Sequence, residues 1–220
     1  MSSEKDFEPE YLGMKIVIAT KNKGKIKEIK SFFTNLPEIE LLTFEDFENF
    51  PDIDEGSMNF IENATLKAKS ISEFTNIVTL ADDSGLVVDA LCGEPGVKSS
   101  RYAGENATDG ENRQKLLGKL KNRHSLKDRK ARFVCEMILW DPGKGLLENS
   151  SGVCEGYIGF KEKGSGGFGY DSIFIPSGYD NYNNKTMAEL SQHEKNVISH
   201  RGKALKNLKY FLKEKYGRMT

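Results

Sequence analysis

The chain of 220 residues lacks an excess of charge of one sign, a long apolar run and a paired-cysteine motif. Its 32 Lys and Arg residues balance 33 Asp and Glu residues, so general binding to nucleic acid or to a membrane surface is not expected. No apolar run approaches the roughly 20 residues that span a bilayer. Three cysteines without a C-x-x-C pair predict a reduced, cytoplasmic protein without structural zinc.

The first 13 residues also lack the basic start and apolar middle of a secretory signal. They contain four acids and one lysine, and we expect them to form a mobile tail. Residues 14–220 are then predicted to form a single domain. The 37% hydrophobic and 10% aromatic content is typical of a packed globular protein.

The first half of this domain alternates between strand and helix patterns, which is typical of an α/β fold. In the helix expected at 60–74, Lys67 is predicted on the solvent side. A later segment changes to a hairpin, with strands expected at 132–140 and 147–159. This change predicts a second lobe around residues 100–165 and a cleft between the lobes.

The strand expected at 77–81 leads directly into Asp82, Asp83 and Ser84. We expect the strand to end there, at the edge of the sheet where ligands bind in open α/β folds. Two adjacent carboxylates repel each other, so a metal ion is a natural partner for them. A solvated turn explains the same residues equally well, because Asp, Ser and Gly all favour turns.

A basic loop, Lys21-Asn22-Lys23-Gly24-Lys25, follows the first strand and opens a helix. Free N–H groups and the helix dipole suit a phosphate at such a position. The spacing is not that of a P-loop, and the loop alone fits an ordinary surface connection better.

Gly164 to Gly169 match G-x-G-x-x-G, but a strand rather than a helix is expected next, at 170–175. A dinucleotide site is therefore rejected. The glycines are interpreted as a loop that lets a ligand approach the backbone, with Phe168 available for stacking.

A capping box, Ser191 to Glu194, opens the last expected helix. Its first two turns carry Lys195, His200 and Arg201, and positive charge is unfavourable there. Such a local conflict is expected at a functional site, although a solvated basic face is an equal alternative.

Five segments together resemble the inosine triphosphate pyrophosphatase family, whose members hydrolyse non-standard purine nucleoside triphosphates. They occur in the family's order and span nearly the whole chain: 19–25, 60–64, 81–86, 167–171 and 199–201. The resemblance implies an elongated mixed β-sheet flanked by helices, with two lobes and a central substrate groove.

It also implies the conversion of ITP, dITP or XTP to the monophosphate and pyrophosphate, with Mg²⁺ as cofactor and a homodimer as the assembly. A nucleotide pyrophosphatase of the Maf type is an alternative with different preferred bases. A non-catalytic nucleotide-binding module is a third reading, and neither nucleic acid nor a membrane is expected as a partner.

The resemblance assigns roles to single residues. Asp83 is the expected catalytic base and a metal ligand, and either Glu55 or Asp54 is the second metal carboxylate. Substrate would be bound by phosphate-loop, base-stacking and base-reading residues, namely Thr20, Lys21, Asn22, Lys23, Gly24, Lys25, Ser84, Phe168, Gly169, Tyr170, Asp171, Lys195, His200 and Arg201. Ser172 departs from the family, in which proline commonly stands at this position.

Overall fold

The computed structural model describes residues 13–34, 36, 38–54, 56, 59–179 and 184–216. The expected mobile tail therefore lies outside the described residues, apart from Gly13. The described residues form a six-stranded mixed sheet in the order β2-β1-β3-β4-β5-β6. The strands are β1 (Met14–Ile18), β2 (Ile39–Leu42), β3 (Thr79–Val88), β4 (Lys130–Asp141), β5 (Gly145–Ile158) and β6 (Phe174–Pro176).

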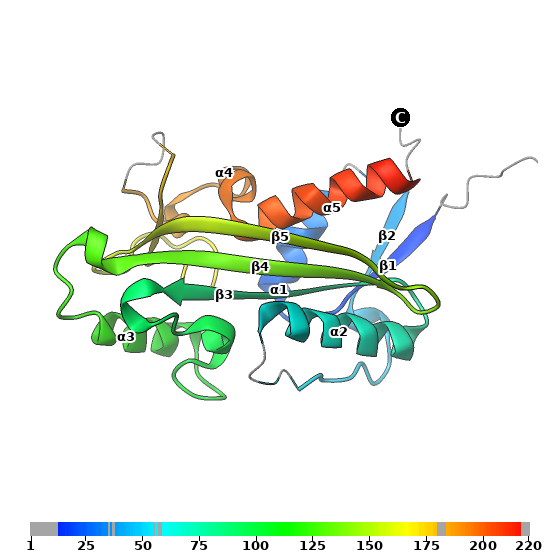
Figure 1. Cartoon of the computed structure of the whole chain (residues 1–220), viewed down its shortest axis with the longest axis horizontal. Helices are drawn as coiled ribbons and strands as arrows, with labels where there is room; N and C mark the ends of the chain where they lie inside the picture. The colour runs from blue at the N-terminus through cyan, green and yellow to red at the C-terminus, as the bar shows by residue number, and fades with distance from the viewer. Residues whose placement is uncertain are drawn as a thin grey trace, which may run out of the picture.

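The long strands β3, β4 and β5 run antiparallel along the whole molecule, whereas β1 and β2 are parallel and occupy one end (Figure 1). This arrangement confirms the expected elongated α/β fold and the hairpin in its second half. The α-helices are α1 (Lys23–Phe33), α2 (Phe60–Thr75), α3 (Asp109–Lys119), α4 (Gln192–Ile198) and α5 (His200–Tyr216).

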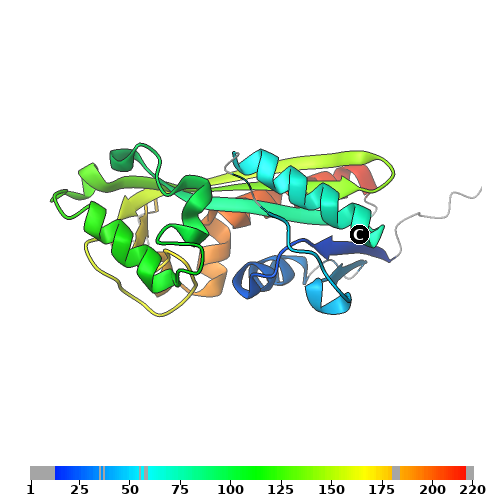
Figure 2. The same ribbon diagram turned by 90° about the horizontal axis from the view of Figure 1, so that it is seen from below.

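The hydrophobic core divides along the length of the sheet. At the β1 end, α2 packs on one face through Ala64, Ala68 and Ile71, and α1 and α5 cover the other face. At the far end, α3 and α4 enclose a separate cluster with the ends of β3, β4 and β5. Figure 2 shows α3 and α2 towards opposite ends of the molecule.

Two expected elements differ from the structure. The predicted strand at 170–175 is mostly a series of turns, and only β6 is extended. The predicted last helix is two helices, because Ser199 has extended backbone angles between α4 and α5. Val197 of α4 is 62% exposed.

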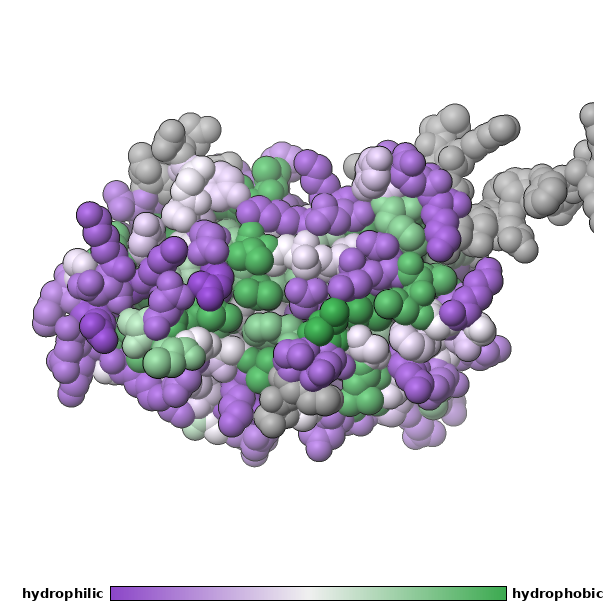
Figure 3. Space-filling view, in the orientation of Figure 1, coloured by the Kyte–Doolittle hydropathy of each residue, from purple (hydrophilic) through white to green (hydrophobic). Residues whose placement is uncertain are grey.

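On the face seen in Figure 3, hydrophobic residues form an interrupted band across the middle of the molecule, with charged residues around it. None of the described helices combines the length and the hydrophobicity that a membrane crossing requires. The cysteines Cys92, Cys135 and Cys154 are all free thiols.

Candidate active site

A cavity of about 240 Å³ lies where β1 ends, between the start of α1 and the glycine loop that precedes β6. Twelve of the residues predicted from the sequence line it: Thr20, Asn22, Lys25, Asp83, Ser84, Phe168, Gly169, Tyr170, Asp171, Lys195, His200 and Arg201. The structure thus brings together segments that are up to about 180 residues apart. It does not place Lys21 in the wall, because this lysine pairs with exposed Asp52 at 2.6 Å.

The basic loop forms the N-terminus of α1, as expected. Asn22 is the N-cap, and its side chain accepts a hydrogen bond from the backbone N–H of Lys25 at 3.1 Å. The first intrahelical bond is made by Ile26, so the N–H groups of Lys23 and Gly24 precede the hydrogen-bonded ladder. Together with the lysine charge, this terminus favours a phosphate group.

Asp82 and Asp83 lie within β3, and the expectation that the strand ends at them is wrong. The strand continues to Val88, and both residues pair with β4. What ends here is the neighbouring parallel strand, because β1 pairs with β3 only as far as Leu80. The acids therefore lie beyond the carboxyl end of β1, which is the kind of position that the argument from open sheets requires.

Because successive side chains of a strand point to opposite faces, the two carboxylates do not share one site. Asp83 faces α2, where it accepts a hydrogen bond from the Asn63 amide at 3.0 Å and lies 3.8 Å from the Lys67 Nζ. Lys67 is only 6% exposed and donates to the Asp82 carbonyl at 2.7 Å, so its predicted position on the solvent face is wrong. The two adjacent acids do not repel each other strongly, because their carboxylates lie on opposite faces of β3 and because each has a cation close to it.

Asp82 faces the opposite side, where it accepts hydrogen bonds from the Arg201 guanidinium at 2.9 and 3.2 Å. Lys25 lies 3.1 Å from the same oxygen. Burial alone would raise the pKa of Asp82, but the charges of Lys25 and Arg201 together hold this pKa well below its usual range. Asp82 thus joins the phosphate loop to α5.

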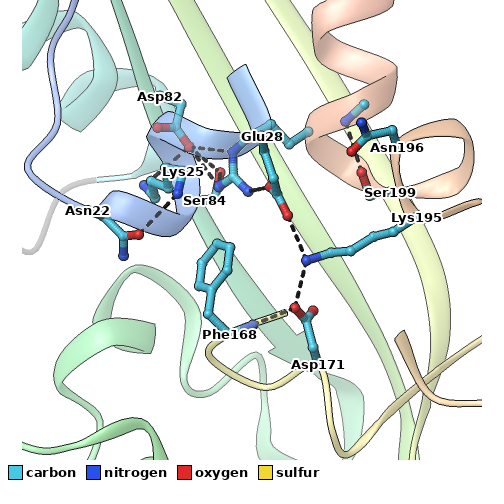
Figure 4. A network of polar contacts seen from close by, with 12 residues as sticks. Asn22, Lys25, Glu28, Asp82, Ser84, Phe168, Asp171, Lys195, Asn196 and Ser199 are labelled. Atoms are coloured by element: carbon cyan, nitrogen blue, oxygen red, sulfur yellow. Dashed lines mark hydrogen bonds and ion pairs between the residues drawn. The ribbon is translucent and has the colours of Figure 1, made fainter. Parts of the chain in front are cut away.

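A second buried carboxylate, Glu28 of α1, binds both basic residues of the C-terminal segment (Figure 4). Its oxygens lie 2.6 Å from the Lys195 Nζ and 2.5 Å from an Arg201 nitrogen. Burial opposes ionisation, yet these two cations keep the pKa of Glu28 below its ordinary value. The unfavourable positive charge that the sequence places here is therefore neutralised by buried acids.

Lys195 also donates to Asp171 at 2.6 Å, and in Figure 4 its side chain reaches between Asp171 and Glu28. Burial raises the pKa of Asp171 despite this lysine. Lys195 is itself buried, which alone would lower its pKa, but the two carboxylates raise it. It is therefore held as a fixed cation at the wall of the cavity.

Phe168 projects from a turn in which Gly167 and Gly169 both have positive φ, at 74° and 59°. A Cβ at Gly167 would lie 2.1 Å from an Asp171 oxygen, so this position requires glycine. The Phe168 ring packs against Gly24 and lies 4.9 Å from the Lys195 Nζ. The loop thus places an aromatic ring beside the N-terminus of α1.

His200 is 6% exposed and stacks on Phe133, with ring centroids 4.7 Å apart and planes inclined by 11°. Burial, with the charges of Arg201 and Lys195, lowers the pKa of His200 well below its usual value, so the ring is neutral. Within the described part of the chain its Nδ1 has no hydrogen-bond partner. The His200 ring is therefore an uncharged polar group in the cavity wall.

The predicted metal carboxylates are only partly described. Glu55 lies outside the described residues, and Asp54 is exposed. No group of three or more His, Cys, Asp or Glu residues suited to a metal occurs among residues that the structure describes. Of the predicted metal ligands that the structure describes, Asp83 alone lines the cavity.

Sequence reasoning missed several polar residues of the site. All of them lie on helices, and they are Glu28, Asn63, Lys67, Asp109 and Arg113. The sequence pattern could have indicated two of them. Asn63 and Lys67 are four residues apart, and they lie beside Ala64 and Ala68 on the buried side of α2.

The fold and the cavity define an α/β protein with a mixed sheet and a polar cavity beyond the end of β1. A family model described as the Ham1 family matches residues 16–211. The dITP/XTP pyrophosphatase of Oceanobacillus iheyensis is 49% identical over 199 residues, which cover 90% of this chain and 98% of that relative. The enzyme of the same name from Geobacter sulfurreducens is 47% identical over 195 residues, covering 89% and 94%.

Among solved structures, a HAM1 protein from Coxiella burnetii superposes with a TM-score of 0.79 at 42% identity, covering 91% of this chain and 99% of that one. The chain therefore belongs to the Ham1 family. This result confirms the family resemblance recognised in the sequence.

Proposed function

We propose that this protein hydrolyses non-standard purine nucleoside triphosphates, namely ITP, dITP and XTP, to the monophosphate and pyrophosphate. The names of its relatives support this activity. The observation that carries the proposal is the single cavity that joins the N-terminus of α1, the Asp83 carboxylate and the Phe168 ring. These three features match what the reaction requires: a site for the phosphates, a carboxylate for the attacking water and an aromatic surface for the base.

In the proposed reaction, the attacking water loses its proton to Asp83 while its oxygen bonds to the α-phosphorus. The bond from that phosphorus to the bridging oxygen breaks, and pyrophosphate leaves. The Asn63 amide orients the Asp83 carboxylate through their 3.0 Å hydrogen bond. Lys67, 3.8 Å from Asp83, favours the ionised carboxylate that can accept a proton.

Mg²⁺ fits the donors that are present. This ion is usually held by one or two carboxylates together with substrate phosphates and water, and Asp83 supplies one carboxylate in the wall of the cavity. We propose Glu55 or Asp54 as the second. When bound, Mg²⁺ would neutralise phosphate charge and acidify water.

For base recognition, we propose that Phe168 stacks on the purine and that Lys195, His200 and Arg201 bind its 6-oxo edge. Lysine has three N–H groups and arginine five, so the contacts to buried carboxylates and to Ser84 leave one donor on each, counted over the described residues. A donor cannot accept a hydrogen bond from the amino group of adenine, so ATP is rejected.

We propose a homodimer as the assembly and the cytoplasm as the compartment. The family resemblance supports the dimer, and the apolar band in Figure 3 offers surface for self-association. Three free thiols suit a reducing compartment.

The test is an assay of pyrophosphate release from ITP, XTP, dTTP, ATP and GTP, with Mg²⁺ and again with excess EDTA. We expect ITP and XTP to be the best substrates and EDTA to abolish the release. Preference for dTTP would instead identify the Maf-type activity. No release from any of the five would leave only a nucleotide-binding module.

A further inference from the structure

The backbone of Gly169 is held on both sides by α3. Its N–H donates to the Asp109 carboxylate at 2.7 Å, and its carbonyl accepts a hydrogen bond from the Arg113 Nη1 at 2.7 Å. The two side chains are four residues apart, so they lie on the same face of α3. One helix thus satisfies both polar groups of a single glycine about 60 residues later in the sequence.

The start of α3 is itself fixed by a capping box. Thr108 accepts a hydrogen bond from the Glu111 N–H, and the Glu111 carboxylate binds the Thr108 N–H at 2.7 Å. Asp109 is the first residue of the helix, and its position is set by this cap. Figure 2 shows the yellow segment that leads to the glycine loop passing beside α3.

Gly169 directly follows Phe168, and the turn that carries Phe168 is closed on itself. The Phe168 N–H donates to the Asp171 carboxylate at 2.9 Å, and the Phe168 carbonyl accepts from the Asp171 N–H at 3.2 Å. The backbone polar groups of Phe168 are thus used within the turn. Those of Gly169 tie the turn to the lobe of α3.

Arg113 is held from its other side. Its Nε forms an ion pair with Glu162 at 2.9 Å, in an orientation that is not a hydrogen bond, and Ser172 donates to the same Glu162 oxygen at 3.1 Å. The Arg113 guanidinium beside Glu162 and the hydrogen bond from Ser172 lower the pKa of Glu162. Ser172 therefore closes a ring through Glu162 and Arg113 back to the Phe168 turn.

We propose that Asp109 and Arg113 are positioning residues that hold the Phe168 ring at the height required to stack on the substrate base. This inference rests on the proposed function, because it assigns Phe168 to the base. Asp109 and Arg113 act through Gly169 and not on the reacting phosphate, which lies at the Asp83 end of the cavity.

The position of the contact predicts a kinetic signature. Stacking on the base is made equally in the bound substrate and in the transition state, so its loss raises KM and leaves kcat nearly unchanged. Loss of one such hydrogen bond corresponds to about a five- to tenfold rise in KM. A purely structural role would lower the melting temperature and leave KM unchanged.

The test compares Arg113→Met and Asp109→Ala with three controls. Asp109→Asn keeps an acceptor for the Gly169 N–H, Arg113→Lys keeps a donor for its carbonyl, and Gln114→Ala changes an exposed residue of the same helix. For each variant, KM and kcat for ITP, the melting temperature and the Kd of inosine monophosphate are measured. We expect KM and Kd to rise together in the first two variants and to recover in the two conservative ones.

If KM and Kd of both Arg113→Met and Asp109→Ala stay within twofold of the wild type, the proposal is overturned. A fall in melting temperature without a rise in Kd overturns it as well. Failure of the proposed function has a different readout, because the wild type itself would then release no pyrophosphate. The Kd of inosine monophosphate still reports on positioning in that case.

Discussion

Asp82 and Asp83 are neighbours in the sequence, but their carboxylates lie on opposite faces of β3. Asp82 is held by Lys25 and Arg201, whereas Asp83 faces Asn63 and Lys67 and lines the cavity. Different helices supply the partners on each face, so a substitution of one acid tests its role separately from that of the other.

Replacing Asp83 with Asn should lower kcat for ITP by roughly 10²- to 10⁴-fold, because the amide cannot take the proton of the water. The fold should persist, since an amide oxygen can still accept from Asn63. Circular dichroism and pyrophosphate release measure the two effects. Asp52→Asn, at an exposed surface pair, is the matched control. Near wild-type activity of the Asp83 variant would remove this residue from the mechanism.

Replacing Glu28 with Gln should lower the free energy of unfolding by about 3–5 kcal/mol, because two buried cations lose a shared counter-charge. Lys195 and Arg201 are both nearly inaccessible to water, which cannot replace the carboxylate. Urea unfolding measures the change. Glu40→Gln breaks the half-exposed pair with Lys15 and should change stability by less than about 1 kcal/mol. Equal effects of the two substitutions would contradict the network.

At the scale of elements, α5 approaches β5 so closely that no side chain fits between them at Gly152. A Cβ there would lie 2.1 Å from the His200 carbonyl oxygen and 2.8 Å from the Ala204 nitrogen. Both are backbone atoms, so relief requires the helix to move. Because α5 carries His200 and Arg201, this contact sets the height of the basic cluster above the sheet.

Gly152→Ala should therefore destabilise the protein by about 1–3 kcal/mol and also raise KM for ITP. The control is Gly118→Ala within α3, where a Cβ meets nothing within 4 Å. That change should stabilise the protein by roughly 0.5–1 kcal/mol, because alanine favours a helix interior. Thermal unfolding and steady-state kinetics of both variants give the comparison. A Gly152 variant as stable as the wild type would show that α5 is not fixed by this contact.

At the scale of the whole molecule, the buried neutral His200 makes stability depend on pH. Its folded pKa is lowered, so between pH 7 and pH 5 the unfolded chain binds a proton that the folded protein does not. Stability is therefore lost as pH falls through the unfolded value of about 6.5. The contribution of neutral His200 to stability is therefore complete only above that pH.

His200→Gln should flatten the stability curve between pH 7 and pH 5, by up to about 1.4 kcal/mol per pH unit. The measurement is the free energy of unfolding in urea at a series of pH values. His193→Gln, at an exposed position two residues after the N-cap Ser191, is the matched control. Parallel curves for wild type and His200→Gln would contradict the assignment.

Local patterns in the sequence were sufficient for the α/β alternation, the β4–β5 hairpin and the capping box at Ser191, because each depends on residues near one another in the chain. The motifs also pointed to twelve residues that do line the cavity. The break at Ser199 was missed, because the apolar spacing of α4 and α5 reads as one helix.

Only the tertiary structure decided how the charges pair. The sequence alone determined that acids follow the buried start of β3 and that basic residues gather around the start of α5. It could not show that β3 continues past Asp83, that Lys67 is buried, or that Glu28 neutralises Lys195 and Arg201. These facts depend on which faces of separate elements meet, and contacts between residues 28 and 201 leave no trace in local spacing. The physical reason is that burial makes each charge require a partner, and packing supplies that partner from a distant segment.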